Sequence, residues 1–318
     1  MPKSAPDVVL RLEGLKKSYG DLLAVDNLSL EVHRGEIFGF LGPNGAGKTT
    51  TISMICGLLR SNAGQVLVDG TPLVGNYRAC QRLMGLCPQE LVIWEALTCL
   101  EQLEFIGRQY DVARRTARKK SLELLDLLGL SDRRNKLAKT LSGGMKRRLN
   151  LALALVHDPE ILILDEPQAG LDPQSRILVR EYIQSLAGTM TVILTTHEMD
   201  EADRLAQRIA IIDHGKLLVL DTSEGLKSRI GAGDILEIKV PEDQEERVDR
   251  FLKALPNNLN HLAYQEGSLR LVGSDMLEVL PSLLERLQDA GLQAQDITIR
   301  KKTLEDVFIS LTGRGLRE

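Results

Sequence analysis

The chain has 318 residues, of which 43% are hydrophobic and 26% charged, and its formal net charge at pH 7 is −4. These values are ordinary for a soluble globular protein, and the length allows a domain of about 200 residues followed by a smaller one. The slightly acidic charge gives no general reason to expect nucleic-acid binding. The chain contains no apolar run of roughly 18 residues, and its first six residues lack a hydrophobic signal region. We therefore expect a cytosolic protein.

Four cysteines occur, at positions 56, 80, 87 and 99, and they lack the spacing of metal ligands. A cytosolic protein keeps its thiols reduced, so we expect no disulfide framework. Cys56 and Cys87 lie in apolar segments and are predicted to be small buried hydrophobes.

The first predicted elements in chain order are strands over residues 8–12 and 28–32, separated by a turn at residues 19–21. Tyr19 in this turn either packs on the edge of the sheet or offers its ring to a nucleobase. The sequence alone leaves both interpretations open. Residues 36–41 then form an apolar run typical of a buried strand, and residues 50–59 contain no proline and can form a helix.

A glycine-rich loop, residues 42–50, joins that strand to that helix and has the pattern G-x-x-x-x-G-K-T of a phosphate-binding loop. Its glycines let successive backbone N–H groups point at one anion, and the start of the following helix adds partial positive charge. Lys48 brings a full charge to the β- and γ-phosphates, and the Thr49 hydroxyl is placed to ligate Mg²⁺. The loop predicts nucleoside triphosphate binding. Its candidate binding residues are Gly42, Pro43, Asn44, Gly45, Ala46, Gly47, Lys48, Thr49 and Thr50.

The next segment contains predicted strands over residues 64–70 and 84–87, and then a helical region over residues 98–130. The helical region carries a basic run. Such a run is typical of a solvated helix face, and a patch for nucleic acid or lipid headgroups is the alternative. The run consists of Arg114, Arg115, Arg118, Lys119 and Lys120.

A second candidate anion site begins the helix that follows residue 141 and ends before Pro159. Ser142 suits the N-cap position, and Gly143 and Gly144 permit close approach of a ligand. A capped helix start with bare glycines can bind an anion, although a simple capped helix is the alternative.

Two adjacent carboxylates follow a buried-strand run, residues 161–164. Side by side at the end of a buried strand, Asp165 and Glu166 are costly unless a cation is present. Asp165 suits Mg²⁺, and Glu166 suits a general base for an attacking water. A further strand over residues 191–195 leads to His197, which is either structural or placed at the sheet edge where ligands bind.

The last part of the chain begins after a predicted closing hairpin, residues 209–220. Glycines at 231 and 233 mark a boundary, so the predicted domains are 8–230 and 234–318. The second domain reads strand–helix–strand–strand–helix–strand with a final helix from Thr303, an order typical of a ferredoxin-like fold. It shows no catalytic constellation and suggests regulation, dimer contacts or partner docking. Its elements are predicted at residues 235–240, 245–255, 261–264, 268–272, 276–290 and 296–300.

Together the motifs of residues 8–230 resemble the nucleotide-binding subunit of an ATP-binding-cassette (ABC) transporter. Gln89 matches the Q-loop glutamine, His197 the switch histidine, and Tyr19 the adenine-stacking aromatic of the A-loop. The remaining motifs are the Walker A loop at 42–49, the signature at 141–145, the Walker B strand with its catalytic glutamate at 161–166, and the D-loop ending at Asp172. The resemblance implies an α/β P-loop NTPase fold of the ABC ATPase type, a mixed sheet core with antiparallel β and helical subdomains, followed by the small α+β ferredoxin-like domain.

Two positions depart from the usual family pattern. Met145 stands where glutamine is most frequent, and Gln168 where threonine is usual. Methionine there, and the tail at residues 304–308, are similar to the branch that pairs with ABC-2-type exporters of drugs, lipids and polysaccharides, including daunorubicin-resistance-like and ABCA-like ATPases. The sequence gives no explanation for Gln168.

The resemblance implies a homodimer in which two copies face head to tail and bind ATP between the Walker A loop of one copy and the signature helix of the other. Ser142, Gly143 and Gly144 would then contact the γ-phosphate on the partner. Glu166 would activate water, while Thr49, Gln89 and Asp165 would hold Mg²⁺ and His197 would position the γ-phosphate. A separate ABC-2-type membrane permease would dock on the segment after Gln89 and keep the chain on the cytoplasmic face of the cell membrane.

The main functional hypothesis is an ATP-hydrolysing subunit that powers export through this permease. The alternative is a cytosolic ABC ATPase that acts on the ribosome or on nucleic acid, and the basic run is its only support. A small-molecule P-loop kinase would need neither the signature nor the switch motif. The cargo is not encoded in any motif of this chain.

Overall fold

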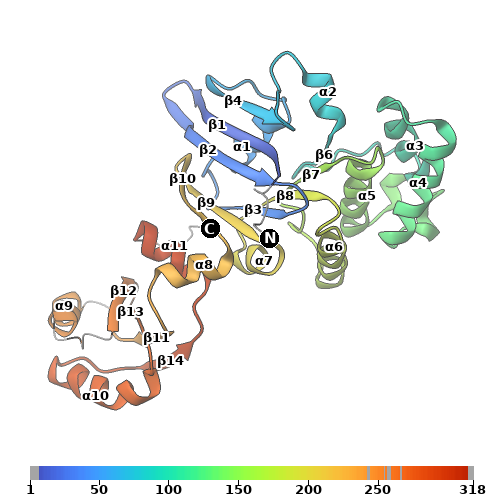
Figure 1. Cartoon of the computed structure of the whole chain (residues 1–318). Helices are drawn as coiled ribbons and strands as arrows, with labels where there is room; N and C mark the ends of the chain where they lie inside the picture. The colour runs from blue at the N-terminus through green and yellow to red at the C-terminus, as the bar shows by residue number, and fades with distance from the viewer. Residues whose placement is uncertain (1–6, 242–243, 254, 256–258, 266, 314–318) are drawn as a thin grey trace, which may run out of the picture. The chain divides into compact units, whose positions relative to one another are not determined.

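The computed structural model describes residues 7–241, 244–253, 255, 259–265 and 267–313 (Figure 1). Two predictions concern residues outside those described. The absence of a signal region is predicted for residues 1–6, and the helix predicted over 245–255 includes residue 254. The chain divides into two compact units, Met1–Leu220 and Asp221–Glu318, which are described one at a time. Among the described residues, no helix is both long enough and apolar enough to cross a bilayer.

The first unit contains an antiparallel sheet with the strand order β2-β1-β4-β5. The two predicted N-terminal strands are longer than expected and continue to the turn at Gly20 and Asp21, where Tyr19 pairs with Leu22. The sheet consists of β1 (Val8–Tyr19), β2 (Leu22–His33), β4 (Ala63–Val68) and β5 (Thr71–Pro72).

The second sheet of this unit has six strands in the order β10-β9-β3-β8-β7-β6. Its central strands are parallel, since β3 pairs in parallel with β8 and β9, and β7 with β6 and β8. The carboxyl ends of β3, β6, β7 and β8 therefore meet at one edge. The strands are β3 (Ile37–Leu41), β6 (Met84–Cys87), β7 (Ile161–Asp165), β8 (Thr191–Thr196), β9 (Arg208–Asp213) and β10 (Lys216–Asp221).

Both faces of this parallel sheet are buried, which explains why its strands read as continuous apolar runs. Successive side chains point to opposite faces, so one strand contributes to two cores. On β7, Leu162 and Leu164 pack in the core shared with the helices, while Ile161 and Ile163 pack in the core shared with α1 and the antiparallel sheet.

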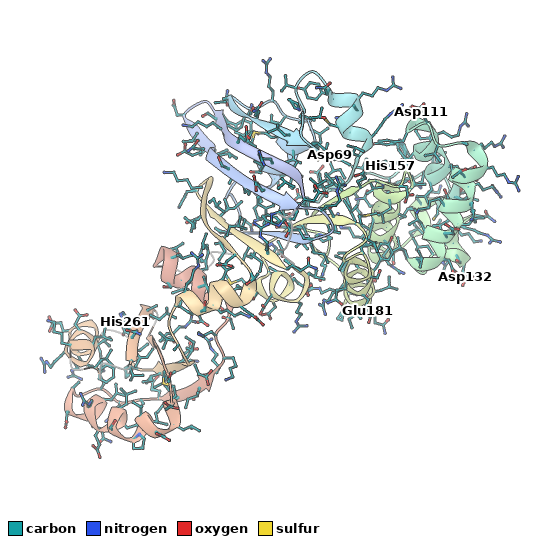
Figure 2. All side chains as sticks on the ribbon, in the orientation of Figure 1. Asp69, Asp111, Asp132, His157, Glu181 and His261 are labelled. Carbon is teal, nitrogen blue, oxygen red and sulfur yellow. The ribbon has the colours of Figure 1, made fainter. Side chains whose placement is uncertain are left out.

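The helices α3, α4 and α5 form a group that packs together (Figure 1). A capping box between Thr98 and Glu101 fixes the start of α3. Tyr110 follows α3 and His157 lies just after α5, and their rings stack with centroids 3.8 Å apart (His157 is labelled in Figure 2). The helices of this unit are α1 (Lys48–Ile55), α2 (Tyr77–Arg82), α3 (Cys99–Gln109), α4 (Arg114–Leu127), α5 (Gly143–Leu155), α6 (Pro173–Ser185) and α7 (Met199–Leu205).

The second unit contains an antiparallel sheet with the order β12-β13-β11-β14. The βαββαβ succession from β11 to β14 confirms the predicted ferredoxin-like arrangement. The unit begins before the predicted boundary glycines, because α8 packs against α11. Its elements are α8 (Ser223–Arg229), β11 (Asp234–Lys239), α9 (Glu245–Lys253), β12 (Leu259–Gln265), β13 (Ser268–Gly273), α10 (Met276–Asp289), β14 (Asp296–Arg300) and α11 (Leu304–Thr312).

The two faces of strand β11 carry different chemistry. Leu236 and Ile238 pack in the apolar core of the second unit. Glu237 points to the other face and accepts hydrogen bonds from Arg270 and Arg300, and Arg300 also donates to the fully buried Asp306 of α11 at 2.7 and 2.8 Å. The tail motif at residues 304–308 is thus the start of an ion-paired helix.

Candidate active site

Four of the predicted motifs follow the carboxyl ends of neighbouring parallel strands. The glycine-rich loop follows β3, Gln89 follows β6, Glu166 follows β7 and His197 follows β8. The register places the strand ends level, because Leu41 pairs with Thr196 and Asp165 with Thr195. Segments far apart in the sequence therefore converge at one edge of the sheet, where doubly wound folds bind their ligands.

The glycine-rich loop has a backbone that requires its glycines. Gly45 and Gly47 have φ of 81° and 99°, in the left-handed region. A Cβ on Gly47 would lie 2.4 Å from the Ala24 carbonyl oxygen, so no larger residue fits. The loop ends at the N-terminus of α1, which begins at Lys48, two residues earlier than the sequence predicts. The helix stops at Ile55 rather than near residue 59, since Gly57 takes a φ of 69°.

The Lys48 ammonium group lies within this loop. It donates hydrogen bonds to the carbonyl oxygens of Gly42 at 2.7 Å and Pro43 at 3.1 Å, and the side chain is largely buried. Burial lowers the pKa of Lys48, while the nearby charges of Glu166 and Asp165 act in the opposite direction. A buried cation bonded only to neutral carbonyls can gain energy by moving to an anion.

Glu166 is the centre of the hydrogen bonding at this edge. Its carboxylate accepts from Gln89 Nε2 at 3.2 Å and contacts His197 Nδ1 at 2.9 Å. The Thr195 hydroxyl accepts from the Glu166 backbone N–H at 3.0 Å and donates to the Asp165 carboxylate. The structure thus brings together the candidate base, the predicted Q-loop glutamine and the predicted switch histidine.

The start of α5 combines a cap with open space. The Ser142 hydroxyl accepts from the Met145 N–H at 3.3 Å, as the sequence predicts for an N-cap. A Cβ on Gly143 would meet nothing within 4 Å, so the helix start is accessible there. A Cβ on Gly144 would lie 2.6 Å from the hydroxyl oxygen of Ser175, so Gly144 is needed for close packing against the start of α6. Asp172 caps that helix by accepting from the Ser175 N–H at 3.1 Å.

Met145 itself is partly buried against the core that α5 shares with α3 and α4. The thioether side chain therefore serves packing here, a role that a long unbranched apolar residue fills well.

Gln168, unexplained by the sequence, has a clear place in the structure. Its side chain is 5% exposed, and its Nε2 donates to Glu201 Oε2 of α7 at 2.6 Å. Arg180 of α6 pairs with the same buried carboxylate. Gln168 Oε1 has no hydrogen-bond partner, although a cavity lined by Glu166, Gln168 and His197 adjoins it. The glutamine therefore links the D-loop segment to the helix that follows His197.

Sequence reasoning missed Arg147, which is 4% exposed and lies beside Glu166. Its guanidinium group donates to five backbone carbonyl oxygens in the segments that follow β6 and β7. The three basic residues at 146–148 read as the polar face of α5, and no local signal distinguishes the buried one.

Tyr19 lies at the end of β1 with 50% of its surface exposed, and the Lys17 ammonium lies 5.4 Å from its ring centroid. The ring is open to a planar ligand rather than covered by the sheet.

The cysteines and the basic run match the simpler interpretations. All four cysteines are buried and unpaired, and burial raises the pKa of Cys56 to about 12. Within the basic run, Arg118, Lys119 and Lys120 pair with acidic groups on their own protein, which favours a solvated helix face.

A glycine-rich loop between a parallel strand and a helix, with an acidic pair at the end of another strand of the same sheet, defines a P-loop nucleoside triphosphatase. The comparisons narrow this class. The family model described as "ABC transporter" matches residues 25–169. The linearmycin resistance ATP-binding protein LnrL of Bacillus subtilis is 38% identical over 98% of this chain and 100% of its own length. This chain belongs to the family of ABC transporter ATP-binding proteins, binds ATP and is an ATP hydrolase.

Other relatives have drug resistance or Nod factor export in their names. The daunorubicin/doxorubicin resistance ATP-binding protein DrrA of Streptomyces peucetius is 38% identical over 97% of this chain and 93% of its own length. The Nod factor export ATP-binding protein I of Ralstonia nicotianae is 36% identical over 98% and 95%. A solved ATP-binding subunit of an ABC transporter superposes with a TM-score of 0.65 at 26% identity, covering 70% of this chain and 93% of that chain.

Proposed function

We propose that this chain is the subunit that binds and hydrolyses ATP to power export of a substrate through a separate ABC-2-type membrane permease. The observation that carries the hydrolytic part is the Glu166 carboxylate, held by Gln89 and His197 at the sheet edge that also holds Lys48. Export is supported by the relatives, whose names describe drug resistance and Nod factor export. The same relatives favour this function over action on the ribosome or nucleic acid.

The phosphates of ATP would lie on the loop formed by residues 42–50. Lys48 would exchange the carbonyl oxygens of Gly42 and Pro43 for phosphate oxygens, which offer it full negative charge. The exposed ring of Tyr19 would stack on the adenine. The glycine backbone N–H groups and the start of α1 would complete the cradle.

Thr49, Gln89 and Asp165 would hold Mg²⁺ through their side-chain oxygen atoms. Among the described residues, no group of three or more His, Cys, Asp and Glu side chains is arranged to hold a metal by itself. That fits Mg²⁺, which is usually bound by one or two carboxylates together with substrate phosphates. When bound, Mg²⁺ would neutralise charge that develops on the phosphates.

Glu166 would take a proton from the attacking water, because its oxygens lie at the edge of the sheet and are oriented by two neighbours. His197 would donate to the γ-phosphate from its other ring nitrogen, and Gln89 would orient the water. These roles follow the family resemblance, and the cluster geometry supports them.

The second anion site supports a head-to-tail homodimer. Ser142, Gly143 and Gly144 begin α5 with an accessible, capped helix start. A second copy would bring its nucleotide to this start, where the helix dipole favours a phosphate. Asp172 at the D-loop would lie at the same interface, because the Gly144 backbone packs against it.

The docking surface for the permease would be the apolar segment after Gln89 together with α3. Leu91, Val92, Trp94 and Phe105 are each at least 40% exposed. The Trp94 and Phe105 rings meet edge to face with centroids 5.5 Å apart, so two of these side chains form one surface. Grouped exposed apolar side chains of this kind mark interaction sites. Permease contact here would place the chain on the cytoplasmic face of the cell membrane.

The second unit, which the sequence predicts at residues 234–318 and which begins at Asp221 in the structure, would be a domain accessory to the ATP-binding domain. Its buried charges are paired within the domain, so its contribution would be regulation or contacts rather than chemistry.

The proposal is tested by recovering partners of the Glu166→Gln protein from native membranes in the presence of ATP, because this variant should hold nucleotide without turnover. We expect a multi-span membrane protein to be recovered. A matched Glu166→Gln, Trp94→Asp protein should lose it, since the charge disrupts the apolar surface. Recovery of ribosomal or nucleic-acid material instead would reject the export function and leave the ATPase assignment intact.

A further inference from the structure

The side chain of Arg147 connects three parts of the candidate active site. Its Nη1 donates to the carbonyl oxygens of Pro88 at 2.6 Å and Gln89 at 2.8 Å. Its Nη2 donates to those of Asp165 at 2.8 Å and Glu166 at 2.7 Å, and its Nε to that of Pro167 at 3.1 Å. The residue itself belongs to α5, whose first turn is the capped glycine start at residues 142–144.

These contacts use the particular chemistry of arginine. A guanidinium group carries five N–H donors in a rigid planar fork, whereas a lysine ammonium has three donors and acts as a point charge. Arg147 donates hydrogen bonds from this group to backbone carbonyl oxygens in two separate segments. A buried cation that is fully hydrogen-bonded to backbone fixes the relative position of the segments it bridges.

The bridged segments include the backbone of Glu166, which has a φ of 46°. A non-glycine residue in this left-handed region is disfavoured and persists where the surroundings over-determine it. Arg147 bonds the carbonyl groups of Glu166 and of the residues before and after it. The arginine therefore stabilises the bend that points the Glu166 carboxylate at Gln89 and His197.

We propose that Arg147 is a positioning residue that holds Gln89 and Glu166 in their hydrolytic arrangement and ties this arrangement to the α5 helix start. The inference rests on the proposed function, in which that helix start contacts the nucleotide of a second copy. Arg147 follows Ser142 by five residues, so a rigid helix of roughly 7–8 Å joins the two places. A displacement of α5 by the nucleotide of the second copy would then move the backbone of Glu166, the general base of this subunit.

The first test compares Arg147→Lys and Arg147→Gln with Arg148→Lys. Arg148 is a matched control because it lies on the same helix and donates to Leu128 and Gly129, away from the bridged segments. We expect both Arg147 variants to lower kcat about 10- to 100-fold with KM for ATP changed less than about threefold. The Arg148→Lys protein should keep its kcat within about threefold. Equal kcat values for Arg147→Lys and the wild type would overturn the proposal.

A second test separates positioning from loss of folding. Trp94 is the single tryptophan of the chain and follows Gln89 by five residues, so its fluorescence reports on the bridged segment. In Arg147→Lys we expect higher acrylamide quenching of Trp94 at an unchanged far-ultraviolet circular dichroism spectrum. Guanidinium ion should restore part of the kcat of Arg147→Ala. A kcat loss that tracks the melting temperature, with unchanged quenching and no rescue, would mean that the arginine only stabilises the fold.

The third test combines substitutions. If Arg147 acts through Glu166, adding Arg147→Lys to Glu166→Gln should lower the residual kcat by less than about twofold, because residues that act as a unit are not additive. A full additional 10- to 100-fold loss would overturn action through Glu166. Wild-type turnover of Glu166→Gln alone would instead reject the base assigned under the proposed function, which is a separate failure.

Discussion

Two regions of this molecule bury carboxylates at or beside a β-sheet, and the hydrogen-bond partners of these carboxylates differ between the two regions. In the second unit, Asp306 and Glu237 accept hydrogen bonds from arginine side chains of the same unit. At the end of β7, Asp165 and Glu166 are bonded to a hydroxyl, an amide and an imidazole. The nearest lysine, Lys48, is hydrogen-bonded to carbonyl groups of its own loop.

The difference is the one expected between a structural acidic group and a functional one. A buried carboxylate with a complete set of cationic partners contributes to the fold and has little capacity for a ligand. A buried carboxylate without an arginine or lysine partner, beside a cation that is held by weaker acceptors, can still bind Mg²⁺ or take up a proton. The following changes test this distinction, from the largest expected effect to the smallest.

Replacing Glu166 by glutamine should reduce ATP hydrolysis about 10²- to 10⁴-fold, the usual contribution of a positioned general base. ATP affinity should stay within about threefold, because the amide keeps the shape of the side chain. Steady-state turnover and equilibrium binding of a fluorescent ATP analogue measure the two effects. Glu181→Gln, an identical change on the exposed face of α6 (Figure 2), is the control and should retain wild-type turnover. Equal turnover of the two variants would remove the assigned role of Glu166.

Replacing Asp306 by asparagine should destabilise the second unit by about 3 kcal/mol, because the change leaves Arg300 without its closest anionic partner. Urea unfolding followed by circular dichroism measures the loss. Asp275→Asn is the control, since Asp275 is exposed at a φ of 55°, a conformation that asparagine tolerates. Its effect should stay within about 0.5 kcal/mol. An equally small loss of unfolding free energy for Asp306→Asn would mean that the ion pair contributes little to the stability of the second unit.

The Arg300–Asp306 pair should make the stability of the second unit depend on pH in the acid range. Burial alone would raise the pKa of Asp306, but hydrogen bonds from Arg300 and Thr303 and the charge of Arg300 outweigh it and hold the pKa below its ordinary value of 3.8. A lowered folded-state pKa stabilises the fold above that ordinary value, and the stabilisation is lost as the pH falls through the folded-state pKa. The urea concentration at the midpoint of unfolding should therefore fall as the pH is lowered from about 5 to 3. In Asp306→Asn this midpoint should fall less. Parallel curves for the two proteins would contradict this assignment.

Replacing Gln168 should have the smallest effect. Gln168→Thr removes the hydrogen bond to the buried Glu201 and should cost about 1–2 kcal/mol. Gln168→Met fills a similar volume and also removes the unpaired Oε1, so its cost should be lower. Thermal unfolding of the two variants distinguishes them. If the threonine variant is as stable as the wild type, the hydrogen bond to Glu201 contributes little to the stability of the fold.

Much of the site could be predicted because its signals are local. The glycine-rich loop needs its residue types in one fixed pattern, and the strands beside it are short apolar runs. The parallel register then brings Gln89, Glu166 and His197 together without any further signal. The start of α6 also had local signals, Asp172 followed by Pro173, which mark an N-cap and a first helical turn.

The remaining features depend on tertiary contacts that no spacing encodes. Arg147 and Arg148 are the same residue type at adjacent positions, and only the packing of α5 decides which of the two is buried beside Glu166. Gln168 acquires its role from Glu201 and Arg180, which lie on two different helices. The unit boundary follows the packing of α8 on α11 rather than the glycines at 231 and 233.

The most direct test of the account is whether Mg²⁺ and ATP join two copies of the Glu166→Gln protein. Light scattering after size-exclusion chromatography should show a dimer with ATP and a monomer with ADP. Glu166→Gln combined with Lys48→Met should stay a monomer, because the phosphates lose their lysine partner. A Glu166→Gln protein that remains monomeric while saturated with ATP would contradict the claim that the loop and the α5 helix start of two copies share one nucleotide.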